Sequence, residues 1–519
     1  MNQFLRLLGV LLGVAAWVSV PVCGQGVRFS QRYPLTPGVG LSLAASALPT
    51  PTGYLVGGDV LTPAFTRELW LAQLDSAGTL TRQRIYRSDS ASYGGRALLA
   101  LPSGEYVQAV VKTKYGTILR RNAMLWWYNA QGDSLRATSY PAAPYGMIPN
   151  YVCRVASGGF VIVGSIAQTP NANYTFSDWF AIGTDARGRE RWRRTWHLLG
   201  DGFALNATAA PDGGALITGI ARPQLQGGDP FFRNHLAAVK IDSVGTTEWQ
   251  RVYADSTGGW SPVCLSDGGY LIGGFHLTMR TPVRALGRVS LYRLDSAGNL
   301  LRRRDYGPEM DVAQPMRMHQ LPDSSLVLGG GSSDSSQLAA TGGYYAVTGF
   351  GLKLCPDGDS VWWRTYRYYT NPYCNNYLWD LVPTPDGGFA GAGWLHGRAG
   401  GGASTEAWVF KTDADGYVTA GGAPSGVVCI PVGLPGVGAG AAPAPVQVWP
   451  NPAPDGRFRL GGALPGTTYA VLDATGRVVA TGTVRAAEPE LDLGAQAPGL
   501  YLLRLTWPNG RTGTCKLIR

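Results

Sequence analysis

The sequence predicts an all-β protein whose largest part, residues 27–420, is a seven-bladed β-propeller. A repeated pattern supports this prediction: a turn glycine recurs every 53 to 60 residues, and in six of seven copies an aromatic residue follows eight positions later. The composition agrees, because the chain holds 72 Gly, 16 Trp and 25 Tyr but only 15% charged residues. Repeats of this length, with short strands and no helical periodicity, are typical of propeller blades.

The chain begins with a segment that we interpret as a secretory signal peptide, residues 1–24. Arg6 precedes the apolar run Leu7–Val20, and Val22-Cys-Gly24 stands at the cleavage position. Cys23 raises the alternative of a lipoprotein, which Val22 disfavours. No later segment has 18 uninterrupted apolar residues, so we expect no transmembrane segment after cleavage.

Each repeat reads as four strands. The first strand ends in a turn such as Asp212-Gly-Gly, and the third ends in an Asp-x-x-Gly turn, where a bend with φ > 0 favours glycine. The turn glycines are Gly78, Gly132, Gly188, Gly245, Gly298, Gly358 and Gly416, and the aromatic residues are Tyr86, Tyr140, Trp196, Tyr253, Tyr306 and Tyr366. The repeat length and double glycines such as Gly57-Gly58 resemble kelch-like blades.

The two ends of the repeat region complement one another. The strand Val27–Tyr33 carries the aromatic residue of the pattern without a turn glycine, whereas the last repeat has the turn glycine Gly416 without an aromatic residue eight positions later. We therefore predict that Val27–Tyr33 pairs with Trp408–Asp413, which completes the ring and removes an exposed sheet edge.

The net charge of +10 could indicate an anionic partner. The arginines cluster in the fourth strand of the repeats, as in Arg302–Arg304, and we interpret them as protection of an outer edge, with an anion-binding rim as the alternative. We expect no nucleic-acid partner.

Sequence motifs give little sign of catalysis. The five histidines lack metal-ligand spacing, and the chain has no nucleophile elbow, P-loop or dinucleotide fingerprint. We therefore expect no catalytic residues, no metal and no cofactor, and favour binding over catalysis.

Six cysteines remain after the expected cleavage, and export would permit disulfides. By proximity the expected bridge joins Cys355 to Cys374, while free buried thiols are the alternative. The other four are Cys153, Cys264, Cys429 and Cys515.

Ligand binding is expected on the face that carries the longer loops, among them Leu277–Gly287 and His396–Thr405. Aromatic rings in these loops suit a polysaccharide or a protein partner, although the same rings could simply pack the loops. The candidate residues are Tyr115, Tyr174, Phe231, Phe232, Tyr344, Tyr345, Tyr368, Tyr369 and Tyr373.

A Gly/Ala/Pro-rich linker, residues 421–445, precedes a C-terminal domain at 446–519. Its motifs follow in order: Val446-Gln-Val-Trp-Pro-Asn-Pro452, Val471-Leu-Asp-Ala-Thr-Gly-Arg-Val-Val479, Ala497-Pro-Gly-Leu-Tyr501 and Thr514-Cys-Lys-Leu-Ile-Arg519. This order resembles the type A C-terminal sorting domain of the type IX secretion system of Bacteroidetes bacteria. The matching residues are Pro450, Asn451, Pro452, Gly476, Gly499, Tyr501 and Lys516.

That resemblance implies a small immunoglobulin-like β-sandwich, which the secretion machinery recognises and a sorting protease removes. The propeller would then be secreted, or attached to the outer-membrane surface. We expect it to be a non-catalytic binding module for polysaccharide or protein. The alternatives are an extracellular glycan hydrolase or lyase with its site on the long-loop face, and a structural surface-layer component.

Overall fold

The computed structural model describes residues 27–34, 41–62, 66–88, 90–114, 120–141, 146–168, 177–223, 234–253, 257–281, 284–333, 347–370, 374–399, 402–419, 447–449, 451, 453–461, 465–473, 477–485, 490–506 and 512–519. The chain divides between Pro431 and Val432 into two compact units. Every regular element among the described residues is a β-strand. None of these residues forms a helix that could cross a membrane.

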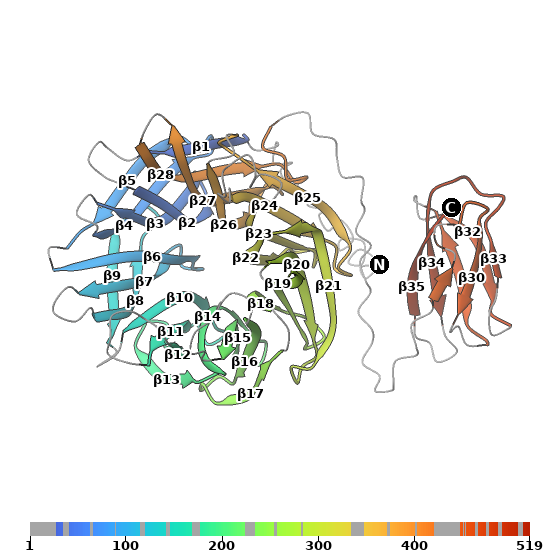
Figure 1. Cartoon of the computed structure of the whole chain (residues 1–519), viewed down its shortest axis with the longest axis horizontal. Helices are drawn as coiled ribbons and strands as arrows, with labels where there is room; N and C mark the ends of the chain where they lie inside the picture. Colours follow the sequence, from blue (N-terminus) through green and yellow to red (C-terminus); the bar gives the residue numbers. More distant parts are fainter. Residues whose placement is uncertain are drawn as a thin grey trace, which may run out of the picture. The chain divides into compact units, whose positions relative to one another are not determined.

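The first unit consists of four-stranded antiparallel sheets arranged around a common axis, as is typical of a β-propeller (Figure 1). Five sheets each hold four consecutive strands. They are β6 (Ala91–Ala100), β7 (Tyr106–Lys114), β8 (Arg120–Tyr128) and β9 (Ser134–Tyr140); β10 (Met147–Arg154), β11 (Phe160–Ala167), β12 (Ser177–Thr184) and β13 (Glu190–Trp196); β14 (Gly200–Ala209), β15 (Ala215–Pro223), β16 (His235–Ile241) and β17 (Thr247–Val252); β18 (Thr257–Cys264), β19 (Tyr270–Thr281), β20 (Arg284–Leu294) and β21 (Leu300–Met310); and β22 (Val312–Gln320), β23 (Leu326–Ser333), β24 (Val347–Leu354) and β25 (Ser360–Tyr366).

The remaining sheet has eight strands and contains two four-stranded groups. One group is β2 (Leu41–Thr50), β3 (Gly53–Leu61), β4 (Arg67–Asp75) and β5 (Leu80–Tyr86), and the other is β26 (Asn375–Pro383), β27 (Phe389–Ala399), β28 (Gly402–Thr412) and β1 (Phe29–Tyr33). A single parallel pairing, Leu41 with Thr405, joins the two groups.

The predicted pairing of the N-terminal strand is confirmed. Strand β1 runs antiparallel to β28, with Phe29 opposite Lys411 and Tyr33 opposite Ala407. Phe29 and Tyr33 are buried with Val409 and other residues of the closing sheet. The first and last described strands of this unit therefore belong to one sheet.

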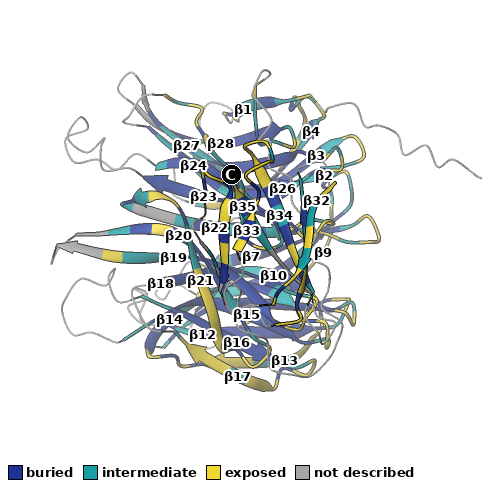
Figure 2. Ribbon diagram, turned by 90° about the vertical axis from the view of Figure 1, so that its right-hand side faces the viewer, coloured by how far each residue is buried: buried dark blue, intermediate teal, exposed yellow. Residues whose placement is uncertain are grey.

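The inner strands contact one another in the order β2, β6, β10, β14, β18, β22 and β26, and β26 returns to β2. Each apolar core lies between neighbouring sheets; for example, Trp362 of β25 packs with Leu381 of β26 and Phe410 of β28. The outermost strands are the least buried, and Figure 2 shows β13 and β17 largely exposed.

The two repeated sequence signals meet across neighbouring sheets. Each tyrosine of the pattern donates a hydrogen bond to the carbonyl oxygen of the turn glycine one repeat further on. The pairs are Tyr33 to Gly78, Tyr86 to Gly132, Tyr140 to Gly188, Tyr253 to Gly298, Tyr306 to Gly358 and Tyr366 to Gly416, at 2.5–3.2 Å. Trp196 takes a variant of this role and donates to the hydroxyl of Thr247 at 2.9 Å.

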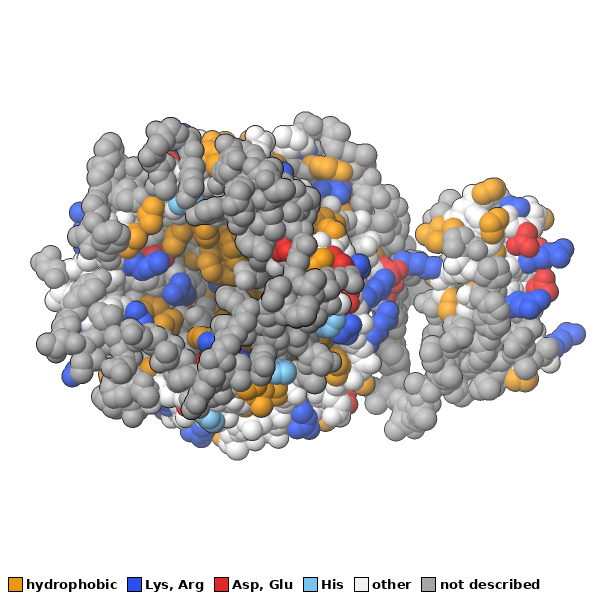
Figure 3. All heavy atoms as spheres, in the orientation of Figure 1, with side chains coloured by type: hydrophobic (Ala, Val, Ile, Leu, Met, Phe, Trp, Pro, Cys, Tyr) orange, Lys and Arg blue, Asp and Glu red, His pale blue; other side chains and the backbone are white. Residues whose placement is uncertain are grey.

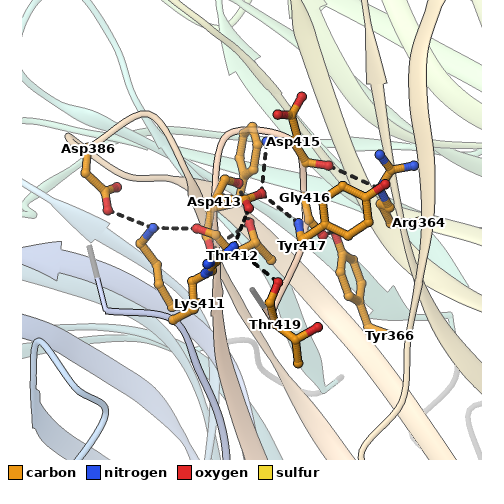
Figure 4. Close-up of polar contacts among 12 residues, drawn as sticks. Arg364, Tyr366, Asp386, Lys411, Thr412, Asp413, Asp415, Gly416, Tyr417 and Thr419 are labelled. Carbon is orange, nitrogen blue, oxygen red and sulfur yellow. Dashed lines mark hydrogen bonds and ion pairs between the residues drawn. The ribbon is translucent and has the colours of Figure 1, made fainter. Parts of the chain in front are cut away.

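Figure 4 shows one such junction in detail. Beside the bond from Tyr366 to Gly416, the guanidinium of Arg364 donates to the carbonyl oxygen of Asp415 at 3.1 Å. The φ of +78° at Gly416 is the left-handed conformation that favours glycine. Lys411 pairs with Asp386 at 2.9 Å, which ties the third strand of this sheet to the turn after its first strand.

Outer-strand arginines also join neighbouring sheets. Arg82 and Arg84 of β5 pair with Asp133 after β8, at 2.7 and 3.2 Å, and Arg304 of β21 pairs with Asp359 at 2.6 Å. These contacts add an inter-sheet role to the edge protection that we inferred from the sequence.

Two expectations are corrected. Cys374 is a free thiol, whereas Cys355 is disulfide-bonded to a partner outside the described residues, so the predicted bridge between these two cysteines is wrong. Proximity in sequence did not predict the disulfide, because Cys355 follows β24 and Cys374 precedes β26, and these strands belong to different sheets.

Two segments that we expected to be long loops are mostly β-strand. Most of Leu277–Gly287 and His396–Thr405 extends the strand pairs β19/β20 and β27/β28, and Figure 2 shows β19 and β20 reaching beyond their neighbours. Continued cross-strand pairing satisfies the backbone hydrogen bonds that an irregular loop would leave to water.

The second unit has two antiparallel sheets. One holds β29 (Gln447–Trp449), β30 (Arg457–Gly461) and β33 (Glu490–Asp492); the other holds β32 (Val478–Thr483), β31 (Thr468–Leu472), β34 (Leu500–Thr506) and β35 (Thr512–Ile518). Phe458 and Leu491 of the first sheet pack with Val471, Leu503 and Leu517 of the second. The two sheets therefore share one apolar core.

Candidate functional site

Each inner strand of the first unit carries a β-bulge near its middle. The register shifts lie between Ala44 and Ser46, Gly95 and Leu98, Pro149 and Tyr151, Ala204 and Asn206, Gly259 and Ser261, Pro315 and Arg317, and Leu378 and Asp380. A bulge inserts an extra residue and redirects a side chain, and bulges are frequent beside binding sites. The fold therefore presents one redirected side chain per inner strand.

The bulged residues converge on a single cavity of about 410 Å³. Those that line it are Ala45, Arg96, Asn150, Leu205, Trp260, Met316 and Trp379. Because they come from all seven inner strands, the cavity lies on the axis of the ring, and we call it the axial cavity. Its volume falls within the range of about 300–1,000 Å³ that is usual for ligand pockets.

Sequence reasoning missed this set, although the repeat contains a signal for it. Six of the bulged residues stand eight positions before the left-handed residue of the following turn. The pairs are Arg96 and Gly104, Asn150 and Gly158, Leu205 and Gly213, Trp260 and Gly268, Met316 and Ser324, and Trp379 and Gly387. Aligning the repeats on this turn would have placed the six in one column, but their side chains share no chemical type.

Aromatic rings form much of the cavity wall. Trp379 lies 5.4 Å from Tyr377, centroid to centroid, and Tyr377 stacks on Trp394 at 5.3 Å. The hydroxyl of Tyr377 donates to the side-chain oxygen of Gln314, which also lines the cavity. These contacts hold the rings in fixed orientations, as is usual in preformed sites.

Two basic side chains, Arg96 and Arg317, and one acidic side chain, Asp59, line the cavity beside the rings. Asp59 is buried and forms an ion pair with Arg67. Burial raises the pKa of Asp59, while the charges of Arg67 and Arg96 oppose that rise. Burial likewise lowers the pKa of Arg96, and Asp59 opposes this decrease. A guanidinium keeps its proton in proteins, so Arg96 remains a cation in the cavity.

Adjoining the cavity is a buried polar cluster centred on Asp380, which follows the bulged Trp379. His319 contacts one carboxylate oxygen of Asp380 at 2.7 Å; Ser46 and Arg317 donate to the other at 2.8 and 3.2 Å. Burial alone would raise the pKa of Asp380, but the charges of Arg317 and His319 and the hydrogen bonds outweigh it, and the pKa is lowered. The cluster links β2, β22 and β26.

Arg317 connects this cluster to the opposite side of the ring. Its guanidinium lies over the ring of Tyr151 in β10, 4.8 Å from the centroid. A cation over an aromatic face is favourable, and Arg is the residue that most often makes this contact. This contact therefore joins β22 to β10 across the axis of the ring. Figure 3 shows basic and apolar side chains together toward the middle of the ring.

A larger depression, about 660 Å³, lies between the β10–β13 and β14–β17 sheets. It is lined by turn residues that include Asp185 and Asp242, together with Trp192 and Arg194. Both carboxylates accept hydrogen bonds from backbone N–H groups of their own turns. Since these carboxylates already stabilise their own turns, the axial cavity is the stronger candidate for a ligand-binding site.

Of the loop aromatics selected from the sequence, only Tyr368 and Tyr369 lie within the described residues. Asn376 accepts hydrogen bonds from both of their backbone N–H groups, at 2.8 and 2.9 Å. Tyr369 packs on the core, and its hydroxyl accepts a hydrogen bond from Arg32 at 3.2 Å. Tyr368 is 37% exposed. Outside the described residues lie Tyr115, Tyr174, Phe231, Phe232, Tyr344, Tyr345 and Tyr373.

Four of the C-terminal motif residues are described, and they hold the last strand in place. The Asn451 amide donates to the carbonyl oxygen of Lys516 at 2.6 Å and accepts from the N–H of Ile518 at 2.9 Å. Gly499 and Arg519 exchange two backbone hydrogen bonds of 3.0 Å. Tyr501 is buried and donates to Ala497 O at 2.5 Å. Outside the described residues lie Pro450, Pro452 and Gly476.

Comparison with known proteins finds no matching family model and no matching curated protein. Among solved structures, a mutant apocarotenoid oxygenase of Synechocystis is 12% identical, with 64% of this chain and 74% of that chain covered and a TM-score of 0.39. A protein of unknown function from Dyadobacter fermentans is 11% identical, with 63% and 96% covered and a TM-score of 0.37.

PorZ, a surface component of the type IX secretion system of Porphyromonas gingivalis, is 10% identical, with 94% of this chain and 99% of that chain covered and a TM-score of 0.18. At these identities and TM-scores the similarities assign neither family nor function.

Proposed function

We propose that the protein is a secreted or cell-surface β-propeller of seven blades that binds a polysaccharide or protein ligand without transforming it. The single observation that carries the binding role is the convergence of seven bulged residues on the axial cavity. The bulge recurs at the equivalent position of every inner strand. Because a bulge locally disrupts strand pairing, and bulges are frequent beside binding sites, this repetition supports a ligand site at the cavity.

The composition of the cavity favours binding over catalysis. Its lining combines the rings of Trp260, Trp379 and Tyr377 with a few polar groups, which is the usual make-up of a ligand pocket. The buried carboxylates Asp59 and Asp380 are each held by an arginine. The lowered pKa of Asp380 makes it a poor proton acceptor, and the carboxylate of Asp59 is occupied by its ion pair with Arg67, so neither is placed as a free general base.

For the second unit we propose a type IX sorting domain, residues 446–519, with an immunoglobulin-like sandwich fold. The motif order supports this, and so does the use of Asn451 and Gly499 to hold the last strand, since a sorting signal must be presented in a defined shape. Residues 1–24 would serve as signal peptide, and 421–445 as the linker where the sorting protease cuts.

A binding experiment with the full chain tests the proposed site. A panel of soluble cell-surface and plant polysaccharides would be screened by affinity electrophoresis against the wild type, Trp379→Ala and Tyr368→Ala. We expect Trp379→Ala to weaken retention by about tenfold or more and Tyr368→Ala to leave it unchanged. The reverse ranking would move the site to the long-loop face. New reducing ends in the polymer would instead favour the hydrolase alternative.

A further inference from the structure

Two N–H groups at the axial cavity have no hydrogen-bond partner. They are Nε of Arg96 and Nε1 of Trp260; both atoms are buried, and both residues are bulged residues of the lining. Buried donors are normally satisfied, so an unpaired donor at a cavity indicates an acceptor that is supplied from outside. Both groups donate, so a ligand that carries acceptor oxygens would satisfy them.

The charges at the cavity do not cancel. Asp59 pairs with Arg67, and Asp380 pairs with Arg317 and His319. Arg96 forms no ion pair within 4.0 Å among the described residues, although it feels the charge of Asp59. One guanidinium is thus left without a direct counter-ion. An anionic oxygen would satisfy its charge and its free N–H together, because Arg binds carboxylates through paired hydrogen bonds.

The aromatic rings and the volume of the axial cavity further restrict the class of ligand that could bind. Trp260, Trp379 and Tyr377 offer apolar faces with polar tips, which suits a ligand that has an apolar ring face and a hydroxylated rim. A cavity of about 410 Å³ admits a small unit rather than a folded surface. Carboxylate, hydroxyls and a compact ring occur together in an acidic sugar.

We propose that the axial cavity binds a uronate unit of an acidic glycan. Arg96 pairs with the carboxylate, the Trp260 N–H donates to a sugar oxygen, and the aromatic rings contact the faces of the sugar. This assignment rests on the proposed function, because it names the ligand class of the same cavity. No bond is made or broken, and the cavity selects by charge.

The test compares matched oligosaccharides by titration calorimetry with the full chain. Galacturonate oligomers are set against galactose oligomers of equal length, and sulfated galactose oligomers form a third arm. We expect galacturonate to bind about tenfold or more tighter than its neutral match, since a charged hydrogen bond is lost without the carboxylate. The preference should weaken at high salt.

Two variants remove the proposed contacts. Arg96→Gln should abolish the preference for galacturonate while leaving the neutral oligomer within about twofold. Trp260→Phe keeps a ring, removes the N–H and should weaken both oligomers. Arg87→Gln, at an exposed pair with Glu68, is the matched control and should change nothing. Arg96→Lys keeps the charge and serves if the Gln variant unfolds; it should retain part of the preference.

The outcomes separate the two proposals. If galactose binds as tightly as galacturonate and Arg96→Gln weakens both equally, the uronate assignment is wrong while the cavity remains a binding site. If only the sulfated oligomer binds, carboxylate selection is wrong. If no oligomer binds, the uronate assignment is wrong, and the polysaccharide screen with Trp379→Ala then decides separately whether the cavity is a site at all.

Discussion

The hydroxyl of Tyr33 donates a hydrogen bond of 2.5 Å to the carbonyl oxygen of Gly78. Tyr33 lies in β1, on the outside of the closing sheet, and Gly78 forms the turn between β4 and β5 in the next group of strands. The contact therefore fastens one end of the repeat region to the other. The same tyrosine-to-glycine bond joins five further pairs of neighbouring sheets, so closure uses the ordinary junction of this fold.

Removing one junction bond should destabilise the first unit measurably. In Tyr140→Phe the ring stays buried, but the carbonyl oxygen of Gly188 loses its donor at 2.6 Å. We expect a loss of about 1–2 kcal/mol in the free energy of unfolding, measured by urea denaturation. Tyr368→Phe, at an exposed ring, is the control and should stay within about 0.5 kcal/mol. Equal effects in the two variants would contradict a stabilising role for the junction bond.

Deleting residues 27–33 should open the ring. The edge of β28 would lose its partner strand, and the buried rings of Phe29 and Tyr33 would leave the core. Burial of such rings contributes roughly 1.5–3 kcal/mol each, so the melting temperature should fall. The exposed edge should also promote association, detectable by light scattering. A deletion variant that stays monomeric and melts like the wild type would argue that the pairing of β1 with β28 does not stabilise the ring.

Asp380 should be the most sensitive carboxylate beside the axial cavity. Asp380→Asn keeps the shape but removes the charge that holds Arg317 and His319, leaving a buried arginine unpaired. We expect a cost of about 3–5 kcal/mol in unfolding free energy. Arg191→Ala breaks an exposed pair with Asp185 and should cost at most about 1 kcal/mol. Similar costs for the two variants would show that the cluster contributes little.

The carboxylate of Asp380 should also make the stability of the protein depend on pH, with a sign that follows from its lowered pKa. Its pKa in the folded protein is lowered from the ordinary value of 3.8, so the unfolded chain takes up the proton first on acidification. Its contribution to stability is thus present above about pH 4 and is lost as the pH falls through the lower folded pKa. Urea unfolding between pH 7 and 3 should show the gap between wild type and Asp380→Asn narrowing below about pH 4; a constant gap would refute this.

Export should depend on the second unit. A chain that lacks residues 446–519 should remain in the periplasm, while these residues fused to a passenger with a signal peptide should carry it to the cell surface. Asn451→Ala removes two hydrogen bonds to the last strand and should reduce export. Cell fractionation measures both. The mature C-terminus should fall between Gly421 and Val446, and intact Arg519 on surface-exposed protein would argue against removal by a sorting protease.

Local signals in the sequence were sufficient for the outline of the fold. An Asp-x-x-Gly turn requires a left-handed residue, and Gly78 and Gly416 adopt φ of +81° and +78°. The unmatched Tyr33 and Gly416 at the two ends were enough to pair β1 with β28, because an incomplete repeat needs its missing strand. Such requirements are met within one turn or one strand pair, and they can therefore be read without knowing the rest of the molecule.

The site was decided only by the tertiary structure. The bulged residues share a position in the repeat but no chemical type, so Arg96 and Trp260 looked like ordinary strand residues. Asp380 meets Ser46, 334 positions away, and His319, 61 positions away, because closure of the ring brings their strands side by side. By itself the sequence determined the repeating unit and the pairing of its ends. Which side chains face the axis together was decided by the packing of the inner strands, since only a closed ring converts equivalent positions in separate repeats into neighbours.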